Sequence, residues 1–418
     1  TGIELVDIHG KEERSRNDWV RGGCLYGIMP ANGLIYTPPH ACACYVLAKL
    51  SGLCAVAPVN DEKIPARSKE DALPEKGPAY GEEPAKSDGT EEDWPMYRHD
   101  PERSGSTPTR VPADVGLLWE AKLGGSLTAA VIAGGKCFVA SKDTHTINAL
   151  DAETGKVSWR FTAGGRIDSP PSVKDGRVVF GSCDGRVYCL RAADGVLIWR
   201  FRAAPQDRRL VAYDQLESLW PVNGRVLIHG IEVHCTAGRS MFLKGGIRYL
   251  RLDLKTGKLI AEHAMDDRRP NSGKRLDDGI RWPNLPTANQ DLLIHDGRNA
   301  YMRTQAFDGE GKRVPDDFEL KPHLFSSIGL LDGTWWHRSY WIYGTSMLGG
   351  AFGWPRTGQK APAGRILVFD GNNVYGFRRK KGHFSALAVT TWMEYHLFAT
   401  EKAPTLGKVK INEPKPLG

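Results

Sequence analysis

A tryptophan recurs at a fixed interval in this chain of 418 residues. Trp119, Trp159 and Trp199 stand 40 residues apart, and the last two lie in the matching stretches ALDAETGKVSWRF and CLRAADGVLIWRF. A regular period of about 40 residues is typical of proteins that repeat one small structural unit, such as propellers and solenoids. The repeat therefore limits the fold more than any other feature of the sequence.

Short runs of β-branched and aromatic residues fill each repeat. Val178–Gly181 and Arg186–Leu190 flank Asp184-Gly185, a pair that favours a hairpin turn, and further Asp-Gly pairs occur at 175–176 and 194–195. Each unit thus has four short antiparallel strands, the pattern of a propeller blade. One blade cannot bury both of its faces, so blades must stack. We expect an all-β propeller with about six visible blades, and seven or eight in the complete ring.

The stretch DAETGKVSW resembles the tryptophan-docking repeat of the pyrroloquinoline quinone (PQQ)-type propellers. That superfamily includes the quinoprotein alcohol dehydrogenases and the outer-membrane assembly lipoprotein BamB. The resemblance implies a structural role for Trp119, Trp159 and Trp199, each packed between neighbouring blades. Longer stretches such as DWPMYRHDPERSGST and FRAAPQDRRLVAYDQLESLWPV resemble large predicted exported propeller proteins of planctomycete-like bacteria. This implies a periplasmic or extracellular location, whereas the fold alone does not define an activity.

A change in composition divides the chain. Residues 60–93 contain eleven acidic and five basic residues, which predicts an acidic flexible linker or insertion. We expect residues 1–59 to be blade material that continues from a missing upstream part, residues 94–400 to form the PQQ-like blades, and residues 401–418 to be a C-terminal tail. No apolar run is long enough to span a membrane. Membrane association would therefore come through the missing N-terminal part.

The net charge of +7 is uneven, because residues 60–93 carry −6 and the rest of the chain carries +13. The basic residues are scattered and accompany no recognisable nucleic-acid-binding module, so we expect solvated surface and no nucleic-acid partner.

One cluster combines cysteine and histidine near the start of the chain. Cys24, His40, Cys42 and Cys44 offer nitrogen and sulfur donors that suit zinc or copper. Residues two apart on a strand face the same side, so His40, Cys42 and Cys44 could converge. The same spacing also allows disulfides or buried thiols, and we favour these over a metal site.

Polar residues gather where the innermost strand of each blade is expected to begin. In propellers these positions face the central channel, where ligands bind. Carboxylates, guanidinium groups and indoles together suit a sugar or an acidic glycan, although the same residues could form salt bridges between blades. The candidates are Arg166, Asp168, Asp214, Glu217, Trp220, Arg281 and Trp282. Further candidates are His337 and Arg338. They lie in an aromatic stretch whose pattern is typical of one packed face of a blade.

Two functions of different classes follow. The first is an exported binding or scaffold module that, like BamB, presents a ring face to a protein or glycan partner. The second is an enzyme in the central funnel, either a quinoprotein-type oxidoreductase or a carbohydrate-active enzyme. PQQ with calcium is the cofactor that the resemblance would imply, but the chain has no adjacent Cys-Cys pair and no calcium triad at the family spacing. The sequence therefore favours the binding module and leaves any catalytic residues unassigned.

Overall fold

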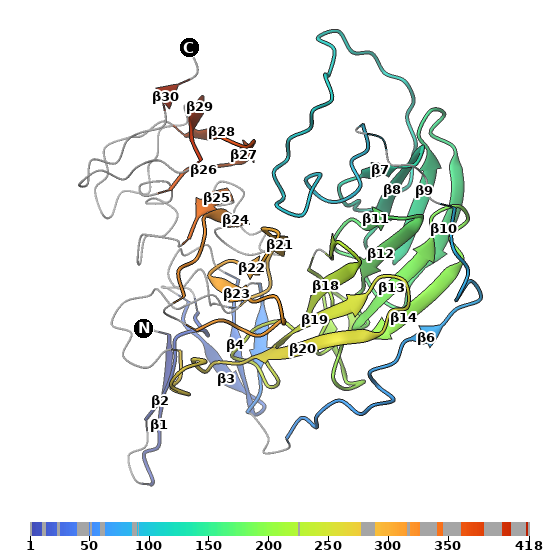
Figure 1. Cartoon of the computed structure of the whole chain (residues 1–418). Helices are drawn as coiled ribbons and strands as arrows, with labels where there is room; N and C mark the ends of the chain where they lie inside the picture. The colour runs from blue at the N-terminus through green and yellow to red at the C-terminus, as the bar shows by residue number, and fades with distance from the viewer. Residues whose placement is uncertain are drawn as a thin grey trace.

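The computed structural model consists of antiparallel β-sheets that follow one another along an arc (Figure 1). Six successive sheets of three or more strands lie along this arc in the described part of the chain, from β7 to β30, with a two-stranded hairpin between the second and the third. The all-β architecture and the four-stranded sheets confirm the predicted propeller fold. The structure describes residues 2–10, 14–22, 26–39, 50, 52–58, 63–85, 90, 92–224, 226–276, 289–315, 318–326, 341–345, 361–379, 395–402 and 415–416.

The first two blades follow the 40-residue repeat, the third comes after an inserted hairpin, and in all three the strands pair in sequence order. The first blade contains β7 (Val131–Ala133), β8 (Lys136–Ser141), β9 (Thr146–Asp151) and β10 (Val157–Thr162). The second contains β11 (Ser172–Lys174), β12 (Arg177–Gly181), β13 (Arg186–Arg191) and β14 (Leu197–Arg202). The third contains β17 (Leu227–His229), β18 (Glu232–Ala237), β19 (Ile247–Asp253) and β20 (Leu259–Met265).

The next two sheets have described strands of only two to four residues. They contain β21 (Ile294–His295), β22 (Ala300–Met302) and β23 (Gln305–Phe307), then β24 (His323–Ser326), β25 (Trp341–Gly344) and β26 (Ala363–Gly364). The last sheet contains β27 (Ile366–Phe369), β28 (Asn373–Arg379), β29 (Tyr395–Glu401) and β30 (Lys415–Pro416).

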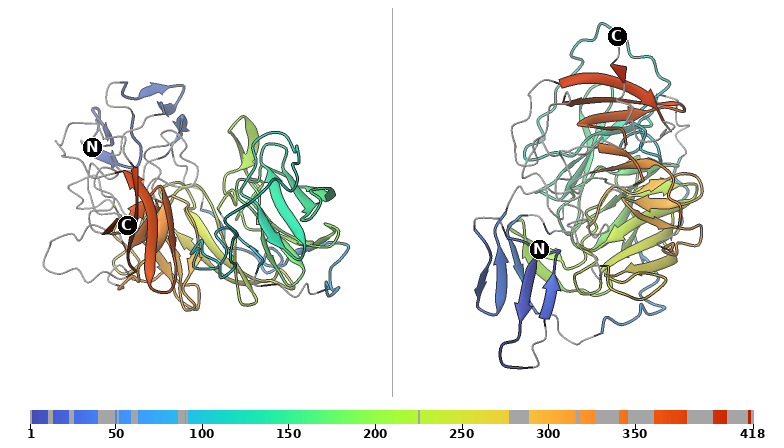
Figure 2. Two further views of the ribbon diagram at one scale, coloured as in Figure 1. Left: turned by 90° about the horizontal axis from the view of Figure 1, so that it is seen from above. Right: turned by 90° about the vertical axis from the view of Figure 1, so that its left-hand side faces the viewer.

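The N-terminal strands form a separate group (Figure 2, blue). This group is the hairpin of β1 (Ile3–Val6) and β2 (Arg14–Asn17), with the sheet of β3 (Met29–Ala31), β4 (Leu34–Thr37) and β5 (Cys54–Val56). The group packs against the third blade, where Trp19 stacks on Phe242 with ring centroids 5.7 Å apart.

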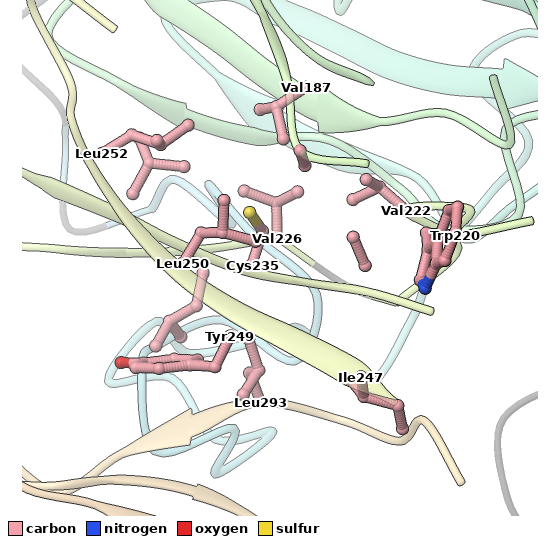
Figure 3. Close-up of a cluster of buried hydrophobic side chains, with 14 of the residues drawn as sticks. Val187, Trp220, Val222, Val226, Cys235, Ile247, Tyr249, Leu250, Leu252 and Leu293 are labelled. Atoms are coloured by element: carbon pink, nitrogen blue, oxygen red, sulfur yellow. The ribbon is translucent and has the colours of Figure 1, made fainter. Parts of the chain in front are cut away.

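The largest apolar core continues from the second blade through the third to β21 and β22. Val187 on β13, Leu250 on β19 and Leu293 beside β21 belong to it, and all three are at most 1% exposed. Figure 3 shows these side chains with Trp220 and Tyr249. Apolar burial is thus shared between blades, as expected for units that cannot fold alone.

Each repeated tryptophan packs on a glycine of the next blade. The ring of Trp159 covers Gly195, where an added Cβ would lie 2.5 Å from the ring, and its Nε1 donates to the Ala192 carbonyl at 3.0 Å. Trp119 and Trp199 make the same contacts with Gly155 and Gly257. These glycines have positive φ values of 69–76°, so the turn and the close approach both favour glycine.

Residues 63–85, within the stretch predicted to be a flexible linker, lie along the outer edges of the second and third blades. Strand β6 (Glu75–Lys76) pairs with β14 as a fifth strand of the second blade. Glu75 lies 3.2 Å from Arg186 and 2.5 Å from Arg200. Three further carboxylates, those of Asp71, Glu82 and Glu83, pair with Arg202, Arg191 and Arg177. We call residues 63–85 the acidic strap.

The segment Trp94–Gly105 crosses the inner ends of the blades. Its backbone bonds the first blade at Ile132, the second at Val173, the sheet of β21 at His295 and the last sheet at Phe369. Arg103 is fully buried, and its guanidinium donates to the carbonyls of Tyr97, Val226 and Leu293. This crossing segment therefore holds blades that are distant in sequence.

Candidate functional site

Two faces follow from the antiparallel order of the blades. Turns between first and second strands lie at one end, while connections between second and third strands, and links between blades, lie at the other. The latter face carries the inserted hairpin of β15 (Arg209–Ala212) and β16 (Gln215–Ser218), between the second and third blades. We call it the hairpin face.

Arg166 is the centre of the polar network on this face. It lies in the link between β10 and β11, and the residue is only 4% exposed. Its Nε and Nη2 donate to the two carboxylate oxygens of Asp168 at 2.8 and 3.0 Å. Its Nη2 is also 3.0 Å from Oε1 of Glu217 on β16, an ion pair without hydrogen-bond alignment. The structure therefore brings together three of the residues predicted from the sequence.

Arg239, in the connection between β18 and β19, completes the network. Its Nη2 lies 2.7 Å from Oε2 of Glu217 and donates to the Ser218 carbonyl at 3.1 Å. The Glu217 side chain has no exposed area, so each of its oxygens faces a guanidinium within a buried site. Two carboxylates and two guanidinium groups leave the network with no net charge.

Cys183 lies beneath these charges. Its thiol donates to Oδ2 of Asp168 at 3.2 Å, and the residue is fully buried. Burial, together with the nearby Asp168 and Glu217 carboxylates, raises the pKa of the Cys183 thiol well above its ordinary value. The opposing charges raise the pKa of Arg166 despite its desolvation. Cys183 is therefore a protonated hydrogen-bond donor and not a nucleophile.

The hairpin is fixed to this network at its turn. The guanidinium carbon of Arg166 lies 4.1 Å from the centroid of the Tyr213 ring. Tyr213 and Asp214 have φ values of 51° and 60°, the left-handed conformation that a two-residue hairpin turn of type I′ requires. Gln215 reaches back to the first blade, where its Oε1 lies 2.6 Å from His145 Nε2 and its Nε2 donates to the Asp143 carbonyl.

The other predicted residues take different places. Asp214 is exposed at the hairpin turn, outside the ion-pair network. Trp220 is 2% exposed, and its indole packs against Gly245, so its ring does not face solvent. The remaining candidates lie outside the described residues: Arg281, Trp282, His337 and Arg338, and the proposed metal ligands Cys24, His40, Cys42 and Cys44.

Sequence reasoning did not select Arg239, Tyr213 or Gln215. Tyr213 and Gln215 belong to a hairpin whose first strand contains Leu210 and Val211, and these strand-forming residues just before a two-residue turn are a usable local signal. Arg239 sits in a long connection, and nothing in its local sequence indicates that it faces Glu217.

The described donor set does not fit a calcium-bound quinone. A calcium site needs several oxygen ligands that carry negative charge toward the ion. Here Asp168 and Glu217 are held by Arg166 and Arg239, which would repel a divalent cation. Among the described residues, no three His, Cys, Asp or Glu side chains gather in a way that could hold a metal ion.

No helix among the described residues is long and apolar enough to cross a membrane.

Comparison with known proteins identifies the repeat. Residues 109–280 match the family model of the outer membrane protein assembly factor BamB. BamB from Moranella endobia (strain PCIT) is 34% identical over 79 residues, 19% of each chain. BamB from Burkholderia pseudomallei (strain K96243) is 32% identical over 97 residues, 23% of this chain and 25% of that protein. The chain thus spans at most a quarter of the length of these relatives.

Among solved structures, quinohemoprotein alcohol dehydrogenase from Comamonas testosteroni is similar at 15% identity and a TM-score of 0.40, over 60% of this chain and 46% of that one. The 40-residue repeat, the stacked four-stranded sheets and the match over residues 109–280 together show a β-propeller whose repeats are similar to those of PQQ-like, BamB-like propellers.

Proposed function

We propose that this propeller is an exported binding or scaffold module, acting in the periplasm or outside the cell, and that hairpin β15–β16 is its contact element for a protein partner. The observation that carries the proposal is the outer face of this hairpin. Val211 and Leu216 lie directly opposite each other in the ladder, and they are 76% and 57% exposed. Tyr213 at the turn is 53% exposed. Exposed apolar and aromatic side chains on one element are typical of protein-binding surfaces.

The anchoring of the hairpin supports the same role. An isolated two-stranded hairpin is marginally stable in water. This one is held at both ends, by the Arg166–Tyr213 stack at the turn and by the bond from the Ser218 amide to the Cys183 carbonyl at 2.8 Å. A preordered contact element loses less conformational entropy on binding, which favours affinity.

The ion-pair network supports a binding module over a funnel enzyme. Asp168 and Glu217 are the carboxylates that a funnel site would use as acid, base or ligand, and both are engaged by arginines. Buried Trp220 offers no stacking surface for a sugar ring. These contacts favour a protein partner over a glycan. The similarity to outer membrane protein assembly factors agrees with that choice.

The test compares the same substitution at two exposed leucines, one on the hairpin and one away from it. Leu216→Asp places a charge on the hairpin face. Leu118→Asp places the same charge in the segment before the first blade, where Leu118 is 76% exposed. Both variants and the wild type are immobilised and incubated with solubilised envelope proteins. A partner that binds the wild type and Leu118→Asp but is lost with Leu216→Asp supports the proposal. Equal capture by all three proteins, or capture by none, contradicts it.

A further inference from the structure

Three histidines meet between the third blade and the next sheet, on the face opposite the hairpin. His229 ends β17, His234 lies on β18 and His295 ends β21. The rings of His229 and His295 are stacked with centroids 3.8 Å apart, and His234 lies 5.2 Å from His295. His295 therefore joins the imidazoles of one blade to the following blade.

The hydrogen bonds favour neutral imidazoles. The Gly297 amide donates to Nδ1 of His295 at 3.0 Å, so this nitrogen is an acceptor and carries no proton. Nδ1 of His234 lies 2.7 Å from the Tyr249 hydroxyl. Nε2 of His234 is buried without a hydrogen-bond partner, and the residue is 3% exposed. Protonation would break the Gly297 bond or place a positive charge in a buried site.

The charged groups around the cluster already have partners. Glu232 lies 3.7 Å from His234, but both of its oxygens accept from Arg251, at 2.7 and 2.8 Å. Asp296, beside His295, accepts from the amides of Arg298 and Asn299 and from the Tyr301 hydroxyl, and Lys321 lies 3.6 Å away. Lys174 of β11 donates to the Gly230 carbonyl next to His229. Three cations thus lie beside the neighbours of the cluster, and both nearby carboxylates are engaged.

The cluster is connected to the crossing segment. The His295 amide donates to the Pro101 carbonyl at 2.9 Å. Displacement of His295 would therefore loosen both its own sheet and the segment that spans the inner ends of the blades.

We propose that His229, His234 and His295 form an acid-sensitive joint, in which protonation of the imidazoles separates the β17–β20 blade from the β21–β23 sheet. The separation begins at this joint. The first two blades contain none of these histidines, and they stay packed against each other.

The pKa values of the cluster support opening of the joint at acidic pH. Burial, with the neighbouring imidazoles, lowers the pKa of His234 from 6.5 to about 3, and burial lowers that of His295 to about 4. A histidine with a lowered folded pKa stabilises the folded joint fully above its ordinary pKa, and this stability is lost as the pH falls from 6.5 toward 4. One such group shifts the opening equilibrium about tenfold per pH unit within this window.

Hydrogen exchange measured by mass spectrometry on the full chain tests the joint. Labelling at pH 7.5 and pH 4.5, with times corrected for the chemical exchange rate, compares the peptides of β21–β23 with those of β11–β14. We expect protection of β21–β23 to fall at least about 100-fold at pH 4.5, the effect of one such histidine over two pH units, with little change in β11–β14. His295→Gln keeps an acceptor for Gly297 but does not titrate, so the pH-dependent loss should shrink at least tenfold. His9→Gln, in an exposed turn, is the matched control and should behave like the wild type.

His229→Gln is the second variant, because His229 is only half-buried and its replacement is better tolerated. It should also reduce the pH-dependent loss. An unchanged loss in both cluster variants would overturn the proposal, as would a uniform loss of protection across all sheets in the wild type.

Discussion

The guanidinium carbon of Arg166 lies 4.1 Å from the ring centroid of Tyr213, and this contact joins a surface hairpin to a buried charge network. Arg166 also pairs with Asp168 and Glu217, so one side chain links the second blade, the hairpin strand β16 and the hairpin turn. The exposed face of the hairpin therefore depends on buried charges for its position.

Replacing Tyr213 should loosen the hairpin without unfolding the propeller. A cation–π contact contributes about 0.5–1 kcal/mol at an exposed site and about 2 kcal/mol when desolvated. Because Arg166 is buried and Tyr213 is half-exposed, Tyr213→Ala should lower the free energy of unfolding by about 1–2 kcal/mol. Mobility of the hairpin should increase, and trypsin should cleave after Arg208 or Arg209 several times faster than in the wild type. Tyr26→Ala is the control, since Tyr26 is 84% exposed in a turn before β3. Equal cleavage rates in the two variants would show that the stack does not hold the hairpin.

Removal of the Glu217 carboxylate should be far more costly. Glu217→Ala leaves Arg166 and Arg239 without one of their counter-charges in a buried site, and breaking a buried pair typically costs about 3–5 kcal/mol. Urea unfolding should show this loss. Glu310→Ala removes an exposed carboxylate that pairs with the exposed Lys312, and should change stability by less than about 0.5 kcal/mol. Similar midpoints for the two variants would contradict the structural role of Glu217.

The repeat was sufficient to predict the fold. Trp159 and Trp199 recur with the glycines that their rings cover, and this local pattern depends on packing between neighbours only. The 40-residue spacing of tryptophan and glycine does not continue into β21–β26, and the described strands there have only two to four residues. The predicted blade pattern was therefore strongest where the repeat was best kept.

The candidate site was only partly predictable. Arg166, Asp168 and Glu217 were selected because they stand where the inner strands begin, and the structure brings them together. Arg239 was missed because its position depends on the path of a long connection. Trp220 was a candidate because indoles stack on sugar rings, but its side chain is buried in the apolar core.

The acidic strap shows a second limit of sequence reasoning. Its composition favours a flexible linker, because carboxylates and prolines are frequent and aromatic residues are few. Glu75 is ordered by Arg186 and Arg200, more than 100 residues later in the chain. Local composition contains no information about such distant partners.

The close contact between Trp159 and Gly195 predicts that a single added methyl group at Gly195 will strongly lower the stability of the fold. Gly195→Ala would place a Cβ 2.5 Å from the Trp159 ring at a φ of +76°, so it combines backbone strain with a clash. We expect a loss of at least about 2–4 kcal/mol in thermal or urea unfolding. Gly135→Ala has a φ of +70° with no atom within 4 Å, and should lose only the strain, about 1 kcal/mol. Equal losses would mean that the ring does not press on Gly195.

The buried thiol of Cys183 should resist alkylation. Its raised pKa and complete burial keep it protonated and shielded at pH 8. Mass spectrometry after iodoacetamide treatment should find the Cys183 peptide unmodified in the native protein and modified in urea. Cys54, which is only half-buried, should be modified sooner. Rapid native labelling of Cys183 would contradict the closed network.

The most direct test of the binding role places a photo-crosslinking amino acid on the hairpin face. Benzoylphenylalanine at position 216 should yield one dominant adduct with a protein of the cell envelope, and the same group at position 118 should not. The adduct should also weaken when Tyr213→Ala loosens the hairpin. No adduct from position 216, or the same adducts from both positions, would contradict the account of the hairpin as the partner-binding element.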